Sequence, residues 1–206
     1  MTVLAIDQGT TSTCALVLER SGMATITKVI EHEQIYPQSK WVEHDPEELI
    51  RNIQACIDSS CLQFSDISAI GIDNQGESCL AWHAETKQAL LPVIVWQDSR
   101  TQNHIDQLKS DGVEELVLKQ SGLPLDANFS ASKLAWLVNN NDEVQLAFKQ
   151  GELRIELLKL ASYGFIFITK RAKRGDVCFY NDYKNFFLRL WGKRYEKTVC
   201  LPISLL

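Results

Sequence analysis

The sequence predicts an α/β fold with a mixed sheet, and three features of the chain indicate it. Three strand-like apolar runs joined by short turns open the chain, a well-marked amphipathic helix follows, and further strand-like runs precede a series of helices. Short turns favour antiparallel neighbours, whereas a strand reached through a helix favours a parallel neighbour. The 206 residues, 45% of them hydrophobic, are enough for one domain with an extension.

The opening strands form a meander in this prediction. Residues 2–6 (TVLAI) and 14–19 (CALVLE) read as a buried pair, and 24–30 (ATITKVI) carries the β-branched residues of a third strand. Gly22 lies in the turn before the third strand, where positive φ is needed.

A helix over 46–59 is the best-marked element of the sequence. Asp45 is a suitable N-cap, Pro46 fits the first helical position, and Glu48 is placed to complete a capping box. Apolar residues then recur at helical spacing, which predicts one buried face.

The later elements alternate between strands and helices. We predict strands at 67–73, 79–85 and 91–98, helices at 100–110, 113–120 and 142–150, and a helix capped by Ser130 or Ser132. Gly151 is expected to end the last helix.

Charge is distributed unevenly along the chain. Residues 1–155 carry 11 Lys/Arg against 22 Asp/Glu, and residues 156–206 carry 10 against 4, within a formal net charge of -5. The acidic balance gives no reason to expect binding to nucleic acid or to a membrane surface. A basic run at 170–174 with nearby aromatics could bind single strands, but solvated charge explains it as well.

Other sequence signals are weak. The six cysteines include no C-x-x-C pair, and the four histidines form no H-E-x-x-H pattern, so no metal site is expected from them. The N-terminus has no signal-peptide pattern, and every apolar run is shorter than the ~18 residues of a membrane span. We therefore expect a cytoplasmic protein.

The polar loop between the first two strands, "IDQGTTST", suggests a phosphate site. Gly9 could take positive φ and let backbone N–H groups converge on an anion, while Thr10, Thr11 and Ser12 add hydroxyl donors. Asp7 could hold Mg²⁺, which prefers oxygen ligands. An acid beside a phosphate indicates a cation between them, although a hairpin with a polar turn fits the same residues.

Five segments occur in one order with consistent spacing: "IDQGTTST", "YPQSKWVEHDPEEL", "GIDNQGES", "PVIVWQDSRT" and "GLPLDANFSASKL". Together they resemble the FGGY family of carbohydrate kinases, and within it the glycerol kinases, over residues 1–155. The resemblance implies a ribonuclease-H-like (actin-like ATPase) fold, here part of the N-terminal domain of a two-domain kinase. Such kinases pass the γ-phosphate of ATP to a polyol or sugar hydroxyl in a cleft between the domains.

The resemblance also assigns roles to residues. It implies that Asp7, Gly9, Thr10, Thr11 and Ser12 bind the phosphates of ATP, with Asp7 also holding Mg²⁺. The substrate side is implied to comprise four residues: Glu77, Trp96, Gly76 and Asn128. A carboxylate such as that of Glu77 accepts strong hydrogen bonds from a diol, although a solvated loop acid is the alternative for it. For Trp96 the alternative is a core aromatic.

Three positions depart from the pattern of the glycerol kinases. Gly76 stands where they have arginine, Asn128 where they have tyrosine, and Cys14 where arginine usually follows the hydroxyl run. Loss of a charged donor from a polar site typically forfeits ~1.5–3 kcal/mol. These departures put glycerol itself in doubt and leave open another polyol or sugar.

The tail from 156 to 206 does not resemble the family. The charge change coincides with this break, so we predict a family domain over 1–155 followed by an atypical basic tail, from a shifted reading frame or a truncated product. The expected general base lies beyond the matched region, which predicts little kinase turnover. The alternative is a non-catalytic binding or regulatory module that keeps the fold. A homo-oligomer is left open for full-length family members.

Overall fold

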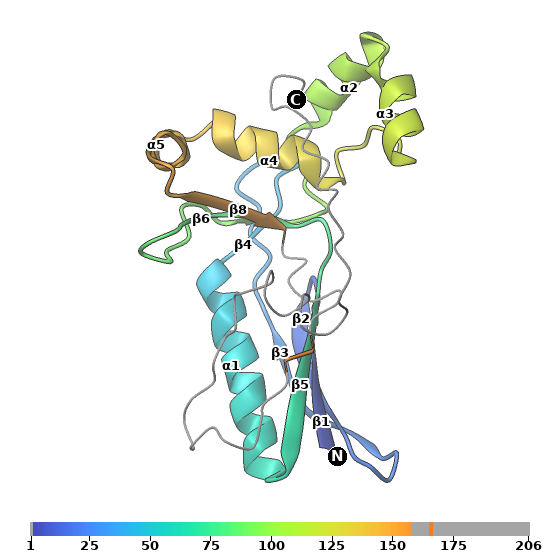
Figure 1. Cartoon of the computed structure of the whole chain (residues 1–206), viewed down its shortest axis with the longest axis vertical. Coiled ribbons are helices and arrows are strands. Elements are labelled where there is room, and N and C mark those ends of the chain that lie inside the picture. Colours follow the sequence, from blue (N-terminus) through green and yellow to red (C-terminus); the bar gives the residue numbers. More distant parts are fainter. Residues whose placement is uncertain (1, 158–164, 167–206) are drawn as a thin grey trace, which may run out of the picture.

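The computed structural model describes residues 2–157 and 165–166, which form two β-sheets and five α-helices (Figure 1). The prediction of an α/β fold is confirmed. The predicted tail lies almost entirely outside the described residues, as does its basic run at 170–174. No helix in the described part of the chain is long and apolar enough to cross a bilayer.

The larger sheet has the strand order β3-β2-β1-β5-β9. Its strands are β1 (Thr2–Gln8), β2 (Ser12–Leu18), β3 (Ala24–Glu31), β5 (Ile67–Asn74) and β9 (Phe165–Ile166). β1 pairs antiparallel with β2 and parallel with β5, so the sheet is mixed as predicted. The parallel pair brings the carboxyl ends of β1 and β5 to one edge. Gly22 has φ 88° in the turn before β3, as expected.

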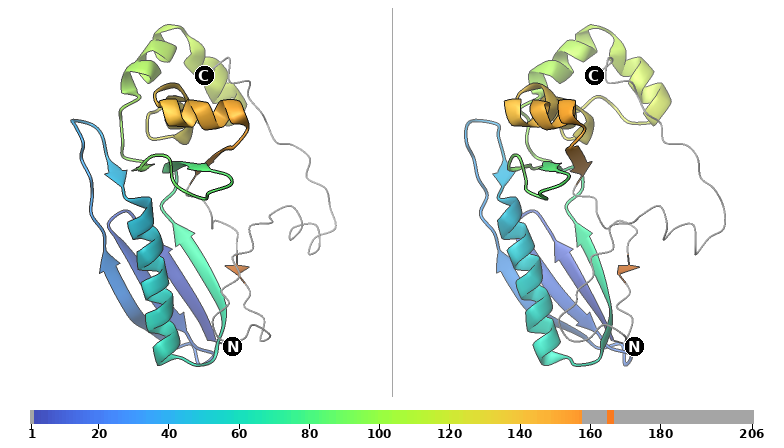
Figure 2. Two further views of the ribbon diagram at one scale, coloured as in Figure 1. Left: turned by 90° about the vertical axis from the view of Figure 1, so that its left-hand side faces the viewer. Right: turned by 60° about the vertical axis from the view of Figure 1, so that its left-hand side comes forward.

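Helix α1 (Pro46–Gln63) covers one face of this sheet (Figure 2). Its apolar side packs on alternate residues of the central strands, including Leu4, Ile6 and Val17. Asp45 caps the helix, because its Oδ1 accepts from the Glu47 N–H at 2.9 Å. The predicted capping box is only half formed: the Glu48 carboxylate accepts from the Glu33 N–H, which ties the helix to the segment after β3.

The smaller sheet has the order β4-β7-β6-β8. Its strands are β4 (Glu43–His44), β7 (Val93–Ile94), β6 (Cys79–His83) and β8 (Leu153–Leu157). The predicted strand 91–98 shrinks to two residues, since Pro92 lacks an N–H and a turn joins the Asp98 N–H to the Val95 carbonyl. β8 runs through the predicted boundary at residue 155 and pairs with β6 on both sides of it.

The remaining helices gather at the end of the molecule away from the N-terminus (Figure 2). They are α2 (Gln102–Ser110), α3 (Val113–Ser121), α4 (Ser130–Asn139) and α5 (Asp142–Gln150). Gly151 ends α5 with φ 76°, as predicted. The predicted serine cap of α4 is wrong: Phe129 holds the N-cap position without a side-chain bond. The first N–H of α4, on Ser130, is bound instead by the carboxylate of Glu77.

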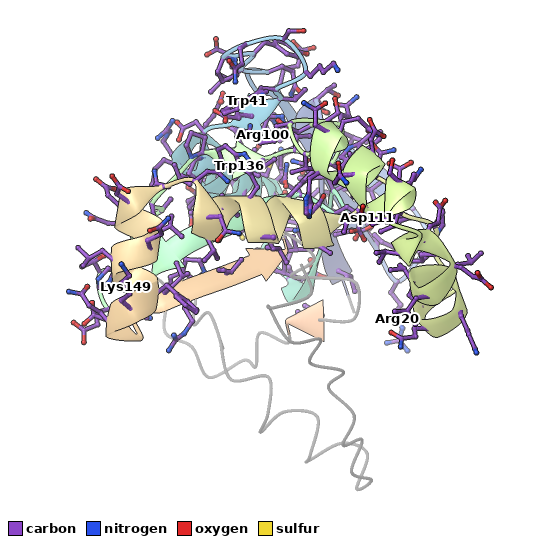
Figure 3. All side chains as sticks on the ribbon, turned by 90° about the horizontal axis from the view of Figure 1, so that it is seen from above. Arg20, Trp41, Arg100, Asp111, Trp136 and Lys149 are labelled. Carbon is purple, nitrogen blue, oxygen red and sulfur yellow. The ribbon has the colours of Figure 1, made fainter. Side chains whose placement is uncertain are left out.

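Arg100 joins β4 to α4 (Figure 3). Its guanidinium lies 3.7 Å from the ring centroid of Trp41 and 4.6 Å from that of Trp136, and it forms ion pairs with Glu43 and Asp98. Because Trp41 and Glu43 belong to the segment around β4 and Trp136 belongs to α4, this cluster fixes the loop after β7, which carries Asp98 and Arg100, against both.

Candidate functional site

A pocket of about 320 Å³ lies where the carboxyl ends of β1 and β5 meet the loops of the smaller sheet. The residues that line it come from four separate segments: Asp7, Gly9, Thr10, Asn74, Gln75, Gly76, Glu77, Trp96, Asn128 and Phe129. Seven of the nine predicted site residues are in this set. Thr11 and Ser12, the other two, are not. Such convergence of polar groups on one concavity is the usual form of a binding site.

The loop after β1 differs from the predicted anion nest. Gly9 is not among the glycines with positive φ, and its N–H donates to the Ser12 carbonyl at 2.9 Å. Its N–H is therefore engaged within the loop. A Cβ at this position would lie 3.4 Å from the Ser12 carbonyl oxygen, an ordinary van der Waals distance, so the turn does not require a glycine here.

Thr10 is held from both sides. Its carbonyl oxygen accepts from His32 Nε2 at 2.9 Å and from Gln34 Nε2 at 2.6 Å. Its hydroxyl oxygen accepts from the indole N–H of Trp96 at 3.0 Å, which leaves the hydroxyl proton for another acceptor. Thr13, at the other end of the hydroxyl run, is fully buried, and its backbone carbonyl accepts from the Cys56 thiol of α1.

Glu77 lies at the start of α4 rather than in open solvent. Its Oε2 accepts from the Ser130 N–H at 2.9 Å and also from the Ser130 hydroxyl. A carboxylate at a helix N-terminus is stabilised by the partial positive charge there. Its backbone has φ 62°, an unusual value for a residue other than glycine. Both bonds use Oε2, so Oε1 remains the oxygen that can meet a ligand in the pocket.

The other predicted substrate residues line the same pocket with different exposure. Trp96 is 36% exposed, which excludes the alternative of a core aromatic. Asn128 is exposed, and its carbonyl accepts from Lys133 Nζ at 2.9 Å. No atom lies within 4 Å of where a Cβ of Gly76 would be, so this side of the pocket is open.

Lys133 supports the loop before α4, and sequence reasoning missed it. The side chain is fully buried, and its Nζ donates to the carbonyls of Ala127, Asn128 and Phe129. Burial lowers the pKa of this amine, while nearby anionic groups partly oppose the shift. Its place among the apolar residues of "SKLAWL" is the only sequence signal that could have revealed it.

Asp7 has a second carboxylate beside it. Asp7 and Asp73 are partners in the parallel register of β1 and β5, and both side chains are exposed. Neighbouring strands are about 4.8 Å apart, so two carboxylates placed this way repel each other unless a cation lies between them. The described residues contain no group of three His, Cys, Asp or Glu side chains that could hold a metal alone.

Comparisons with known proteins show the family of the chain. The sequence model of the FGGY family of carbohydrate kinases, N-terminal domain, matches residues 2–163. The chain belongs to the FGGY family. The glycerol kinase of Paenarthrobacter aurescens is 43% identical over 155 residues, which cover 73% of this chain and 31% of that protein. The glycerol kinase of Rhizobium meliloti is 40% identical, with 99% of this chain and 42% of that protein covered.

Solved structures of a glycerol kinase and a gluconate kinase share this fold. Glycerol kinase from Plasmodium falciparum with ADP superimposes with a TM-score of 0.70 at 29% identity, covering 75% of this chain and 32% of that one. Gluconate kinase from Lactobacillus acidophilus gives 0.65 at 23% identity, over 69% and 29% of the two chains. The fold is thus the actin-like ATPase fold that the resemblance implied.

The extent of the match bears on the predicted domains. This FGGY chain spans about a third of the length of most relatives it matches. The family match runs past residue 155, and the alignment with the Rhizobium meliloti protein continues through nearly the whole chain. The division into a family domain and an unrelated tail at residue 155 stays a prediction.

Proposed function

We propose that this chain forms the phosphate and substrate side of a carbohydrate kinase site, in which the γ-phosphate of ATP passes to a polyol or sugar hydroxyl. The observation that carries the proposal is one pocket with two sides. Asp7 at the end of β1 and Thr10 of the next loop line one side, and Glu77 of the β5–β6 loop and Trp96 after β7 line the other. One pocket can then present a phosphate to a hydroxyl, and phosphoryl transfer depends mainly on such positioning.

In this proposal Mg²⁺ accompanies the nucleotide. Asp7, with Asp73 beside it, supplies the one or two carboxylates that Mg²⁺ typically takes from a protein when phosphates and waters complete its shell. The bound ion would neutralise charge between the acids and the phosphates. The Thr10 hydroxyl, which keeps its proton while accepting from Trp96, would donate to a phosphate oxygen.

The substrate in this proposal is an uncharged polyhydroxy compound. The charged side chains that line the pocket are Asp7 and Glu77, both acidic, so an anionic substrate would be repelled. Glu77 Oε1 can accept from hydroxyls, and the face of Trp96 can pack on the carbon edge. The open space beside Gly76 suits a polyol or sugar larger than glycerol.

A non-catalytic binding module is the second candidate, and the charge of the pocket favours it. Among the described lining residues there is no lysine or arginine to stabilise the charge that develops on a transferring phosphoryl group. We therefore expect ligand binding with little or no turnover from this chain alone.

Melting temperatures of the full chain would test binding, since a ligand that binds only the native state raises them. We expect Mg-ADP to stabilise the protein, and Asp7→Asn to remove the effect. Asp58→Asn, which changes an exposed acid on α1 away from the pocket, is the matched control. No stabilisation of the wild-type chain by Mg-ADP would contradict the proposal.

The substrate side needs its own test. A panel of glycerol, xylitol and D-xylulose should stabilise the wild-type chain, and Glu77→Gln should weaken the effect while keeping an acceptor for the Ser130 N–H. A coupled assay for ADP release then tests the expected lack of turnover. Steady polyol-dependent turnover would show an active kinase and rule out the module, whereas binding without turnover fits both the module and one side of a kinase site.

A further inference from the structure

Six residues form a closed ring of contacts: Thr10, Trp96, Ser78, Gln75, His44 and His32. Thr10, Gln75 and Trp96 line the pocket, and the other three lie behind it. They come from the β1–β2 loop, the segment after β7, the β5–β6 loop, β4 and the segment after β3. Four of the six are buried, with Ser78 and His44 fully so. The ring thus connects every segment that brings a wall to the pocket except the loop before α4.

Hydrogen-bond directions are fixed along the first half of the ring. The Trp96 indole N–H donates to Thr10 Oγ1 and the Trp96 backbone N–H donates to Ser78 Oγ, both at 3.0 Å. The Ser78 hydroxyl donates to Gln75 Oε1 at 3.2 Å. Because Oε1 of Gln75 is an acceptor here, its amide nitrogen faces the other way, toward His44.

The second half of the ring fixes the protons on two imidazoles. Gln75 Nε2 lies 3.0 Å from His44 Nδ1, so Nδ1 must accept and the proton of neutral His44 lies on Nε2. His32 Nε2 lies 2.9 Å from the Thr10 carbonyl oxygen, which can only accept, so Nε2 of His32 carries a proton. The two rings meet edge to face with centroids 4.8 Å apart.

The two remaining ring nitrogens make no hydrogen bond in the part of the chain that the structure describes. His32 Nδ1 and His44 Nε2 are both buried, and neither has a hydrogen-bond partner within the described residues. The edge-to-face contact of the two imidazoles therefore completes the ring through packing.

We propose that His32, His44, Gln75 and Ser78 are positioning residues that hold Thr10 and Trp96 in a fixed relation across the pocket. A buried polar network transmits the loss of one bond to the others, because each unsatisfied group inside it is costly. The assignment of Thr10 to the phosphate side of the pocket and of Trp96 to the substrate side depends on the proposed function. The existence of the ring depends only on the contacts described above.

The indole N–H of Trp96 reports on the ring without any ligand. Its ¹H–¹⁵N resonance in the full chain is assigned by its loss in Trp96→Phe. In His32→Phe, which keeps a ring against His44 but removes the donor to Thr10, we expect this resonance to shift. Its exchange with solvent should accelerate by up to about fivefold, the factor for one hydrogen bond. His32→Gln, which keeps an N–H donor, should restore much of the wild-type position.

Two further variants make the test decisive. His83→Phe is the matched control, since His83 pairs with Glu152 outside the ring and should leave the Trp96 resonance unchanged. Gln75→Met removes two bonds of the ring at similar volume and should reproduce the shift if His32→Phe does not fold. An unchanged Trp96 resonance in a folded His32→Phe or Gln75→Met protein would overturn the proposal.

Binding of Mg-ADP separates this inference from the proposed function. If Mg-ADP binds the wild-type chain, its affinity should fall about fivefold in His32→Phe. If it does not bind the wild-type chain, the proposed function fails. The test on the Trp96 resonance does not need a ligand, so it still shows whether the ring positions Thr10 and Trp96.

Discussion

Replacement of Arg100 by methionine is expected to cost about 3–5 kcal/mol of folding free energy. The Arg100 side chain is only 2% exposed and donates to Glu43 Oε1 at 2.7 Å and to both carboxylate oxygens of Asp98 at 2.8 and 2.9 Å. Asp98 is fully buried. Methionine would keep much of the volume between the two tryptophans but leave these carboxylates without their cation.

The structure offers a matched exposed pair as the control. Arg51 approaches Asp45 at 3.3 Å, but their side chains are 66% and 42% exposed. An exposed ion pair of this kind contributes about 0–1 kcal/mol. Arg51→Met removes the same group as Arg100→Met, and it leaves the bond between Asp45 and the Glu47 N–H intact.

Urea unfolding at pH 7, followed by far-UV circular dichroism, measures both variants. Because a domain of this size is typically stable by only ~5–15 kcal/mol, the Arg100→Met midpoint should fall by a large fraction of its value. The midpoint of Arg100→Lys should lie between those of the wild-type protein and Arg100→Met, since lysine keeps the charge but lacks the planar guanidinium group. Equal costs for Arg100→Met and Arg51→Met at an unchanged urea slope would refute the reasoning.

Three further predictions follow from single residues. Burial, helped by the neighbouring imidazole, lowers the pKa of His44 to about 4. The unfolded chain then binds this proton more readily, and the free energy of unfolding should fall by about 1.5 kcal/mol between pH 6.5 and 5. A urea midpoint that does not change with pH in this range, or a change that persists in His44→Gln, would contradict this. Gly22→Ala should lower the free energy of unfolding by ~1 kcal/mol, because Gly22 has φ 88°, which alanine rarely adopts. Gly76→Ala should leave the melting temperature unchanged, because Gly76 has no positive φ and a Cβ there meets no other atom. Equal losses in the two variants would contradict the argument from φ. Maleimide labelling at pH 8, followed by mass spectrometry, should modify exposed Cys61 and leave Cys79 unmodified. Cys79 should not react because it is buried and burial raises the pKa of its thiol to about 12. Labelling of Cys79 as fast as Cys61 would contradict this and show that its site opens.

The elements that the sequence predicted well are those whose signals are local. The strands of the meander follow from alternating β-branched residues, and Asp45 and Gly151 mark helix ends through their own backbone and side chains. The prediction of a strand over 91–98 was wrong for most of its length, because part of this apolar run is buried without pairing in a sheet. Val95 is fully buried, yet its N–H bonds the Val42 carbonyl outside any named strand, so burial without a regular ladder looks the same in sequence.

The sequence predicted which residues form the site better than it predicted their conformations and contacts. Polar residues after β1 and β5 had to meet, because carboxyl ends of neighbouring parallel strands share one edge of the sheet. The conformation of Gly9 could not be predicted, since a glycine permits positive φ without requiring it. The bond from Ser130 to Glu77 spans 53 residues of sequence, and no local pattern encodes it.

Glu77 illustrates why such a residue serves fold and site together. Its Oε2 replaces the serine cap that the sequence suggested for α4, so the carboxylate cannot swing into solvent without exposing the first N–H of that helix. This restraint holds Oε1 at the pocket before any ligand arrives, and a preorganised acceptor loses less entropy when it binds. A free loop acid, the alternative for this residue, would have neither property. The helix N-terminus therefore turns a common polar residue into a fixed acceptor, and its position follows from the stability of α4.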